Sequence, residues 1–117
     1  MNYSKTTVMG EQKNILANTH YTAINKKVAK SIATSNVIKA GTVINADGTV
    51  LANGAESSAI TKSVLGMVLY DVDVTNEAGT NVVIPVLTHG TVIEEVAKNG
   101  TEYSADVKKA LPQILFV

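Results

Sequence analysis

The chain has 117 residues, of which 45% are apolar and 4% aromatic, and ten lysines balance ten carboxylates to a formal net charge of zero. It has no cysteine, which excludes disulfides, thiolate metal sites and cysteine nucleophiles, and no arginine, which argues against specific nucleic-acid recognition. No apolar run approaches the roughly 18 residues of a membrane span, and residues 1–7 lack the apolar core of a signal peptide. We therefore expect one small domain made in the cytoplasm, with no membrane partner.

The zero net charge hides an asymmetry along the chain. Residues 1–40 contain six lysines and one glutamate, a local charge of +5, whereas residues 41–117 contain four lysines and nine carboxylates, a local charge of −5. The first segment is polar and has no sustained apolar period. We therefore interpret residues 1–35 as an extended, flexible arm and residues 36–117 as a β-rich domain. A helix over 23–33 is an alternative, because three apolar residues there are spaced four apart.

Strands and turns dominate the elements predicted after the arm. Residues 37–44 and 49–52 form two strands joined at Asp47-Gly48, a pair that tolerates the positive φ of a hairpin turn. A polar loop follows at 53–58. The most apolar run, 64–70, predicts a buried strand, and it leads into the alternation of valine and aspartate at 71–74.

The second half of the domain is predicted to end in a helix and a strand. After a turn at 76–79, residues 81–87 form a strand in which Pro85 belongs at an edge or a bulge, because proline cannot donate to a ladder. Thr88-His89-Gly90 is predicted as a turn and 91–96 as a further strand. Ser104 fits the N-cap of a helix over 104–111, Pro112 ends it, and 113–117 closes the chain as a strand.

Catalytic chemistry needs convergent groups, and the sequence offers few. His20 and His89 have no recognisable carboxylate or nucleophile near them in sequence. Asp71 and Asp73 share one face of a predicted strand, where a solvated face is the simpler interpretation than a metal or acid–base pair. Glu94 and Glu95 are adjacent and would point to opposite faces of a strand. We expect no enzyme activity, no cofactor and no metal site.

From residue 37 onward, the order of elements resembles the head decoration proteins of tailed bacteriophages, the lambda-type capsid cement family. The resemblance is carried by Lys39-Ala40-Gly41-Thr42-Val43-Ile44, the Asp47-Gly48 turn, the run from Val64 to Asp71, and His89-Gly90-Thr91-Val92 followed by the closing helix and strand. It covers about two-thirds of the chain. No single motif is specific, and the order of the elements carries the likeness. The chain departs from the family in its longer, lysine-bearing arm and its lack of tryptophan.

The resemblance implies a mainly β fold, a β-tulip-like small barrel or sandwich with one short C-terminal helix. It implies a homotrimer on the outer surface of the virion that stabilises the expanded capsid, and an N-terminal arm that pairs with the major capsid protein. The arm residues expected to contact the capsid are Val8, Lys13, Ile15, Leu16, Tyr21, Ile24 and Val28. The residues expected at the trimer interface are Pro85, Ile114 and Phe116.

Two alternatives stay open at this stage. One is another phage virion module, such as a head fibre base or a tail-tube-like protein. The other is a small non-enzymatic β domain that binds a ligand, although few aromatic residues are available to line a pocket. Nucleic-acid binding is disfavoured, because the lysines of the arm are spread thinly and no run exceeds two.

Overall fold

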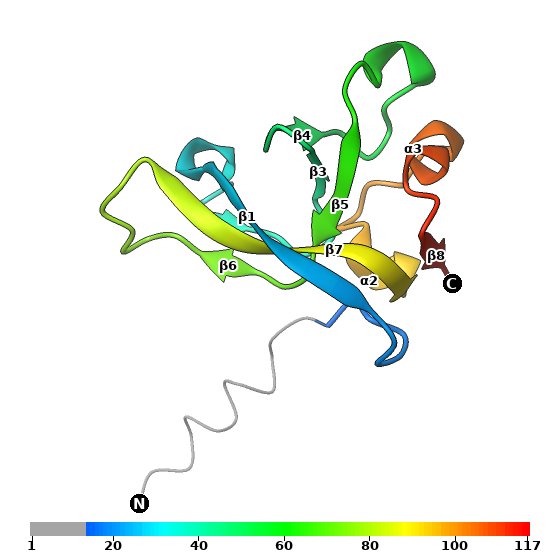
Figure 1. Cartoon of the computed structure of the whole chain (residues 1–117), viewed down its shortest axis with the longest axis horizontal. Coiled ribbons are helices and arrows are strands. Elements are labelled where there is room, and N and C mark those ends of the chain that lie inside the picture. Colours follow the sequence, from blue (N-terminus) through cyan, green and yellow to red (C-terminus); the bar gives the residue numbers. More distant parts are fainter. Residues whose placement is uncertain (1–13) are drawn as a thin grey trace, which may run out of the picture.

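The computed structural model describes residues 14–117, which form a mainly β fold (Figure 1). Within these residues there are eight strands, two short α-helices and two 3-10 helices. The strands are β1 Thr22–Ala29, β2 Val37–Ile38, β3 Val43–Asn45, β4 Val50–Leu51, β5 Val64–Val68, β6 Val72–Asp73, β7 Asn81–Val92 and β8 Ile114–Phe116. The helices are η1 Lys30–Ile32, η2 Ser57–Ala59, α2 Glu94–Ala97 and α3 Ala105–Ala110.

The long strand β7 organises the main sheet. The strand order is β1-β7-β5-β3-β4, with antiparallel neighbours throughout, and β8 pairs in parallel with the end of β7. A second, two-stranded antiparallel sheet joins β2 to β6. Figure 1 shows α2, α3 and β8 at the end of β7, and β6 with the loop that follows it toward the start of β7.

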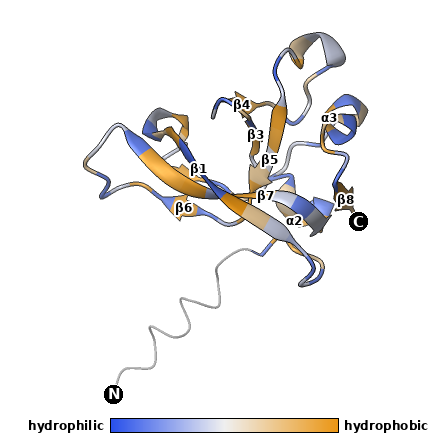
Figure 2. Ribbon diagram, viewed as in Figure 1, coloured by the Kyte–Doolittle hydropathy of each residue, from blue (hydrophilic) through white to orange (hydrophobic). Residues whose placement is uncertain are grey.

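Both faces of the central strands are buried. Successive side chains of a strand point to opposite faces, and each face of these strands packs into its own cluster. Val43, Met67 and Leu87 point to a cluster closed by α3 and β8, which we call the helix-side cluster. Their neighbours Ile44, Val68 and Val86 point to a second cluster with Ile38 and Val74, which we call the β2–β6 cluster. Figure 2 shows the hydrophobic colour concentrated on β5 and β7. The buried strand predicted over 64–70 is confirmed as β5, although it ends at Val68 and Tyr70 is 42% exposed.

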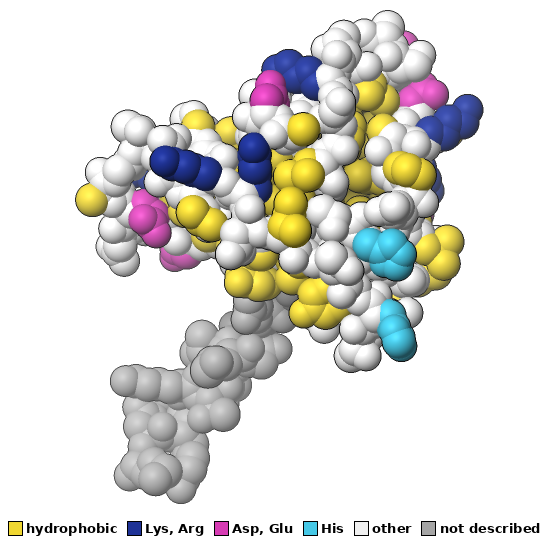
Figure 3. All heavy atoms as spheres, viewed as in Figure 1, with side chains coloured by type: hydrophobic (Ala, Val, Ile, Leu, Met, Phe, Trp, Pro, Cys, Tyr) yellow, Lys and Arg dark blue, Asp and Glu magenta, His cyan; other side chains and the backbone are white. Residues whose placement is uncertain are grey.

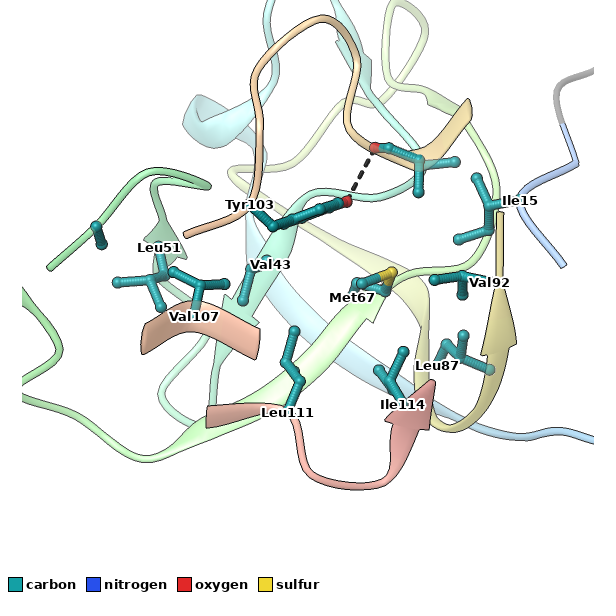
Figure 4. Packing of buried hydrophobic residues seen from close by; sticks show 13 residues of the cluster. Ile15, Val43, Leu51, Met67, Leu87, Val92, Tyr103, Val107, Leu111 and Ile114 are labelled. Atoms are coloured by element: carbon teal, nitrogen blue, oxygen red, sulfur yellow. Dashed lines mark hydrogen bonds between the residues drawn. The ribbon is translucent and has the colours of Figure 1, made fainter. Parts of the chain in front are cut away.

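Tyr103 is the one aromatic residue buried inside the helix-side cluster among the residues described. Its ring packs against that of Phe116 with centroids 5.0 Å apart. Its hydroxyl lies 2.7 Å from the Gly41 carbonyl and 3.0 Å from the Ala97 carbonyl, the second contact being drawn in Figure 4. The buried hydroxyl group therefore has hydrogen-bond partners, and burial raises the pKa of Tyr103.

A bulge in β7 replaces the turn predicted at Thr88-His89-Gly90. Thr22 pairs with His89 and Ala23 pairs with Leu87, so Thr88 has no partner in the ladder. The extra residue reverses the alternation, which is why both Leu87 and Val92 reach the helix-side cluster. The prediction of a turn was wrong because the polar Thr-His-Gly signal marks a bulge within one continuous strand of 12 residues.

Pro85 lies within β7, between β1 and β5. Its carbonyl accepts from the Leu69 N–H at 3.0 Å, so the position of its missing N–H faces the β5 side of the strand. There β5 has already ended at Val68. The proline therefore costs the sheet no ladder hydrogen bond, and the central strand can accommodate it. The prediction of an edge or a bulge for Pro85 was wrong for this reason.

Several predicted elements are confirmed. The β3–β4 hairpin turns at Asp47-Gly48, with Gly48 at φ +92°. The helix α3 begins after Ser104, whose hydroxyl accepts from the Val107 N–H at 3.1 Å, and ends before Pro112. The strand predicted over 37–44 is divided into β2 and β3, because the chain turns at Gly41, where φ is +88°.

The expected boundary between arm and domain, placed at residues 35 and 36, is corrected by the structure. Strand β1 pairs with β7 over eight residues, so neither the helix over 23–33 nor a separate arm describes this part of the chain. Ile15 and Val28 are buried in the two clusters, with 0% and 3% exposure. The remaining arm, residues 1–13, lies outside the described residues.

The strand predicted over 91–96 is also corrected. Strand β7 ends at Val92, and Glu94 and Glu95 lie in the first turn of α2, where carboxylates favour the positive end of a helix. The fold thus contains a second short helix that the sequence pattern did not reveal. Val92 and Ile93 favour a strand by composition. In the structure, the helical turn of α2 instead places Ala97 in the helix-side cluster.

Candidate functional site

The residues predicted to contact a capsid fall into three groups. Val8 and Lys13 lie outside the described residues. Ile15 and Val28 are buried in the body of the protein, and Leu16 is half-buried beside Val92, with which it forms an isolated bridge. Tyr21 and Ile24 remain accessible, each 45% exposed. Of the described candidates, Tyr21 and Ile24 therefore offer the most side-chain surface to a partner.

The outer edge of β1 is open over a short stretch. The Lys30 N–H donates to the Thr80 carbonyl, so alternation turns the backbone groups of Ala23, Asn25 and Lys27 away from β7. The hairpin turn crosses part of this edge, since a Cβ built on Gly48 would lie 3.4 Å from the Lys27 carbonyl oxygen. Backbone pairing with a partner is therefore confined to the region around Ala23 and Asn25.

The charge asymmetry along the sequence does not produce two charged ends in space. The Lys30 ammonium donates to the Glu77 carbonyl at 2.7 Å, and the Asp71 carboxylate accepts from the Ala40 N–H next to Lys39. Figure 3 shows lysine and acidic side chains lying close together at the upper and left borders of one face. The fold therefore brings the basic segment among the acids of the body.

Three of the four lysines in residues 41–117 form ion pairs, whereas the described lysines of residues 14–40 form none. Lys62 pairs with Asp47 at 2.9 Å, Lys98 with Glu95 and Glu102, and Lys108 with Glu94 at 3.0 Å. Among residues 14–117, no carboxylate pairs with Lys26, Lys27, Lys30 or Lys39. Lys26 and Lys27 on β1 and Lys39 after β2 are therefore available to an acidic partner, as is Lys109 of α3.

Asp71 and Asp73 act as structural acceptors and do not converge. Asp71 binds the Ala40 N–H at 2.7 Å, and Asp73 binds the Thr75 hydroxyl at 2.6 Å and its N–H at 2.8 Å. The two bonds from Thr75, first that from the hydroxyl, lower the pKa of Asp73. Within the described part of the chain, no three potential metal ligands lie together.

The remaining candidates for chemistry are separated from one another. Glu94 and Glu95 bind Lys108 and Lys98 respectively, each carboxylate within 3.0 Å of its lysine. His20 and His89 are exposed, and neither imidazole hydrogen-bonds to a described residue. The arrangement gives no described nucleophile–base pair. No helix in residues 14–117 has the length and apolarity needed to cross a membrane.

The predicted trimer-interface residues are only partly available. Ile114 is 5% exposed and belongs to the helix-side cluster, and Phe116 is half-buried between Tyr103 and the Lys108 ammonium, 5.4 Å from the ring centroid. Pro85 is half-buried on β7. Ile114 and Phe116 point inward from β8, whereas Leu115 of the same strand and Val117 after it are 62% and 63% exposed.

A hollow of about 330 Å³ lies between β2, β4 and the loop after α2. Its floor contains Ile38 and Leu51, and its rim contains Lys39, Asn53 and Thr101. The Asn53 amide donates to the Lys98 and Thr101 carbonyls, so its nitrogen holds the loop in place. The volume is at the lower end of the range for small-molecule sites, and no aromatic side chain lines it.

Comparison of the chain with models of protein families, with curated proteins and with solved structures returns no match.

Proposed function

We propose that this protein is a capsid decoration protein, a structural cement that binds the expanded head of a tailed bacteriophage as a trimer and stabilises it. What supports the proposal is the order of its elements from β2 onward. Antiparallel strands are followed by α2, by α3 and then by β8, and the closing helix and strand are those that the resemblance to the lambda-type family implies. The protein acts without catalysis, outside the shell, with the major capsid protein as its partner.

The mechanism is mass action. A protein that binds only the expanded shell stabilises that state by an amount that grows with the ratio of its free concentration to Kd. Many copies on neighbouring sites add avidity without further contacts in each copy. A fold whose central strands are buried on both faces supplies a rigid platform for such binding, and the accessible Tyr21 and Ile24 supply apolar contact surface beside the lysines of β1.

The direct test mixes the purified protein with expanded capsids that lack decoration. Co-sedimentation with the shells and a rise in their thermal rupture temperature are expected. Shells that neither bind the protein nor rupture at a higher temperature would rule the proposal out. Unexpanded capsids are the matched control, because they should bind much less protein.

A second test separates the terminal segment from the body. Deleting residues 1–13 leaves β1 and Ile15 in place, so the variant should keep its fold by circular dichroism. Shell binding should fall at least tenfold, because the segment is expected to contact the major capsid protein. Deletion of residues 1–35 is a poor test, since it removes a paired strand of the sheet. Full binding by the 1–13 deletion would show that the body alone is the anchor.

The hollow beside Lys39 favours the second candidate, a small β domain that binds a ligand. A polar, uncharged or anionic small molecule would meet the lysine ammonium and the threonine hydroxyl at its rim. Chemical-shift mapping with a fragment library tests this, with Lys39→Ala as the variant that should weaken any hit. Hits confined to other surfaces would exclude the hollow as a site.

A further inference from the structure

Two asparagine–glycine pairs of the sequence meet at one loop of the structure. Glycine directly follows Asn53 and Asn99 and no other asparagine of the chain. Asn99 lies within residues 98–101, which we call the loop after α2. The Asn53 amide nitrogen holds the same loop from outside, since it donates to the Lys98 carbonyl at 3.1 Å and to the Thr101 carbonyl at 3.0 Å. The Asn53 amide is therefore a clasp between two segments far apart in sequence.

Asparagine followed by glycine is chemically labile, because glycine carries no side chain to keep its backbone nitrogen from the preceding amide. At Asn53, the Gly54 nitrogen attacks the side-chain Cγ and forms a C–N bond. The Gly54 proton passes to the amide nitrogen, which leaves as ammonia. Water then opens the resulting five-membered imide at either of its two carbonyl carbons, giving aspartate or isoaspartate. The sequence of steps consumes only water and needs no oxidant or reductant.

The structure leaves the attacking nitrogen accessible. Gly54 is exposed, and nothing lies within 4 Å of a Cβ built on it. Its N–H donates to no backbone carbonyl among residues 14–117. The half-buried Asn53 side chain is held by its two hydrogen bonds, so the reaction proceeds during local openings of the loop after α2. We therefore expect conversion to be slower in the folded chain than in the unfolded chain, and not abolished.

We propose that Asn53 is a site of self-modification, at which conversion of the amide to a carboxylate releases the loop after α2. A carboxylate only accepts hydrogen bonds, so the Lys98 and Thr101 carbonyls lose their donor and face a negative charge instead. The Ser104 N–H donates to the Asn53 backbone carbonyl at 2.8 Å, so the longer backbone of isoaspartate also disturbs the start of α3.

The released loop forms one wall of the hollow beside β2 and β4. Asn53, Lys98 and Thr101 all line it, and conversion places a new negative charge on the rim that carries Lys39. Because ammonia is lost, the change cannot reverse, so the clasp opens once in the lifetime of each molecule. The inference stands apart from the proposed function, since it depends only on the contacts of this loop.

Peptide mapping of the full chain by mass spectrometry tests the site. After incubation at mildly alkaline pH, the peptide containing Asn53 should gain the mass of an amide-to-acid conversion and separate into aspartyl and isoaspartyl forms. Asn76, which is exposed in a turn and followed by glutamate, is the control within the chain and should convert several-fold more slowly. Gly54→Ala should slow conversion at Asn53 at least tenfold, because its methyl group hinders the attack while the site has room for it.

The chain unfolded in urea supplies the reference rate. An intact Asn53 in the folded protein, at a time when the unfolded chain has converted, would overturn the proposal, because the fold would then prevent the reaction. Conversion at Asn76 as fast as at Asn53 would overturn it as well, since exposure and not the glycine would then decide the rate.

Hydrogen exchange tests the release of the loop. Its reporter is the Thr101 N–H, which donates to the Lys98 carbonyl at 3.0 Å. This N–H should exchange at least tenfold faster in Asn53→Asp than in the wild type, while the amides of β7 stay protected. Asn76→Asp makes the same change of charge and should leave both unchanged. If Asn53→Asp does not fold, converted wild-type protein separated by anion exchange carries the same measurement. Unchanged exchange at Thr101, or an equal increase in β7, would reject the release.

Discussion

Gly66 of β5 lies against the backbone of Leu87 in β7 so closely that a Cβ on Gly66 would stand 2.0 Å from the Leu87 carbonyl oxygen. Backbone cannot move aside as the end of a side chain does, so the two central strands depend on the absence of a side chain at this position.

Gly66→Ala should therefore destabilise the protein by about 3 kcal/mol, because the strands must separate to admit the methyl group. Urea unfolding followed by circular dichroism measures the change. Gly54→Ala is the control, since nothing lies within 4 Å of a Cβ there, and it should change stability by less than about 0.5 kcal/mol. Similar losses for both variants would contradict the close approach.

Asn45 is the buried polar residue of the core among those described, at 5% exposure. Its amide nitrogen donates to the Thr49 hydroxyl at 3.0 Å, but no donor within residues 14–117 reaches its oxygen. An unsatisfied buried acceptor costs about 1–3 kcal/mol. Asn45→Leu should leave stability unchanged or raise it by about 1 kcal/mol in urea unfolding. A loss above about 2 kcal/mol would show that the oxygen has a partner in solution.

Acid should destabilise the fold in part through Asp73. The bonds from Thr75 lower the pKa of Asp73 in the folded state below its ordinary value of 3.8. The ionised carboxylate of Asp73 contributes its full stabilisation when the pH is above the ordinary pKa. This stabilisation is lost as the pH falls toward the lower pKa of the folded state. Asp73→Asn should therefore flatten the fall of the thermal midpoint between about pH 5 and about pH 2. Glu56→Gln, whose side chain binds no described residue, should leave the curve unchanged.

Ser104 serves both the helix and the core. Its hydroxyl accepts from the Val107 N–H at 3.1 Å and lies 2.5 Å from the Ala55 carbonyl. Ser104→Ala should cost about 1–2 kcal/mol of unfolding free energy, because the N-cap and a second hydrogen bond are lost together. Ser104→Thr retains the hydroxyl and should recover most of this stability. Equal losses for both variants would assign the effect to packing instead.

The sequence predicted those elements whose signals are local. The Asp47-Gly48 turn, the Ser104 cap and the apolar run of β5 each depend on residues that are neighbours in the chain, and each is confirmed. The place of β1 could not be predicted in this way. Its strand has only Val28 fully buried, so it shows no apolar alternation, and its stability comes from backbone pairing with a strand more than fifty residues away.

Candidate interface residues illustrate the same limit. The sequence showed that Ile114 to Val117 alternates, but both faces of this segment are apolar, so only the position of the helix-side cluster decides which face is turned inward. Likewise, Glu94 and Glu95 follow an apolar run that favours a strand, and only the structure shows that β7 ends at Val92 before them.

The bulged strand β7 has a consequence for how the protein unfolds. Because Val82, Ile84 and Val86 belong to the β2–β6 cluster while Leu87 and Val92 belong to the helix-side cluster, neither cluster loses its contacts without releasing part of the other. We therefore expect a single cooperative transition, coincident for probes of either cluster. Under the proposed function, each copy on a decorated shell would then unfold as a whole instead of loosening gradually.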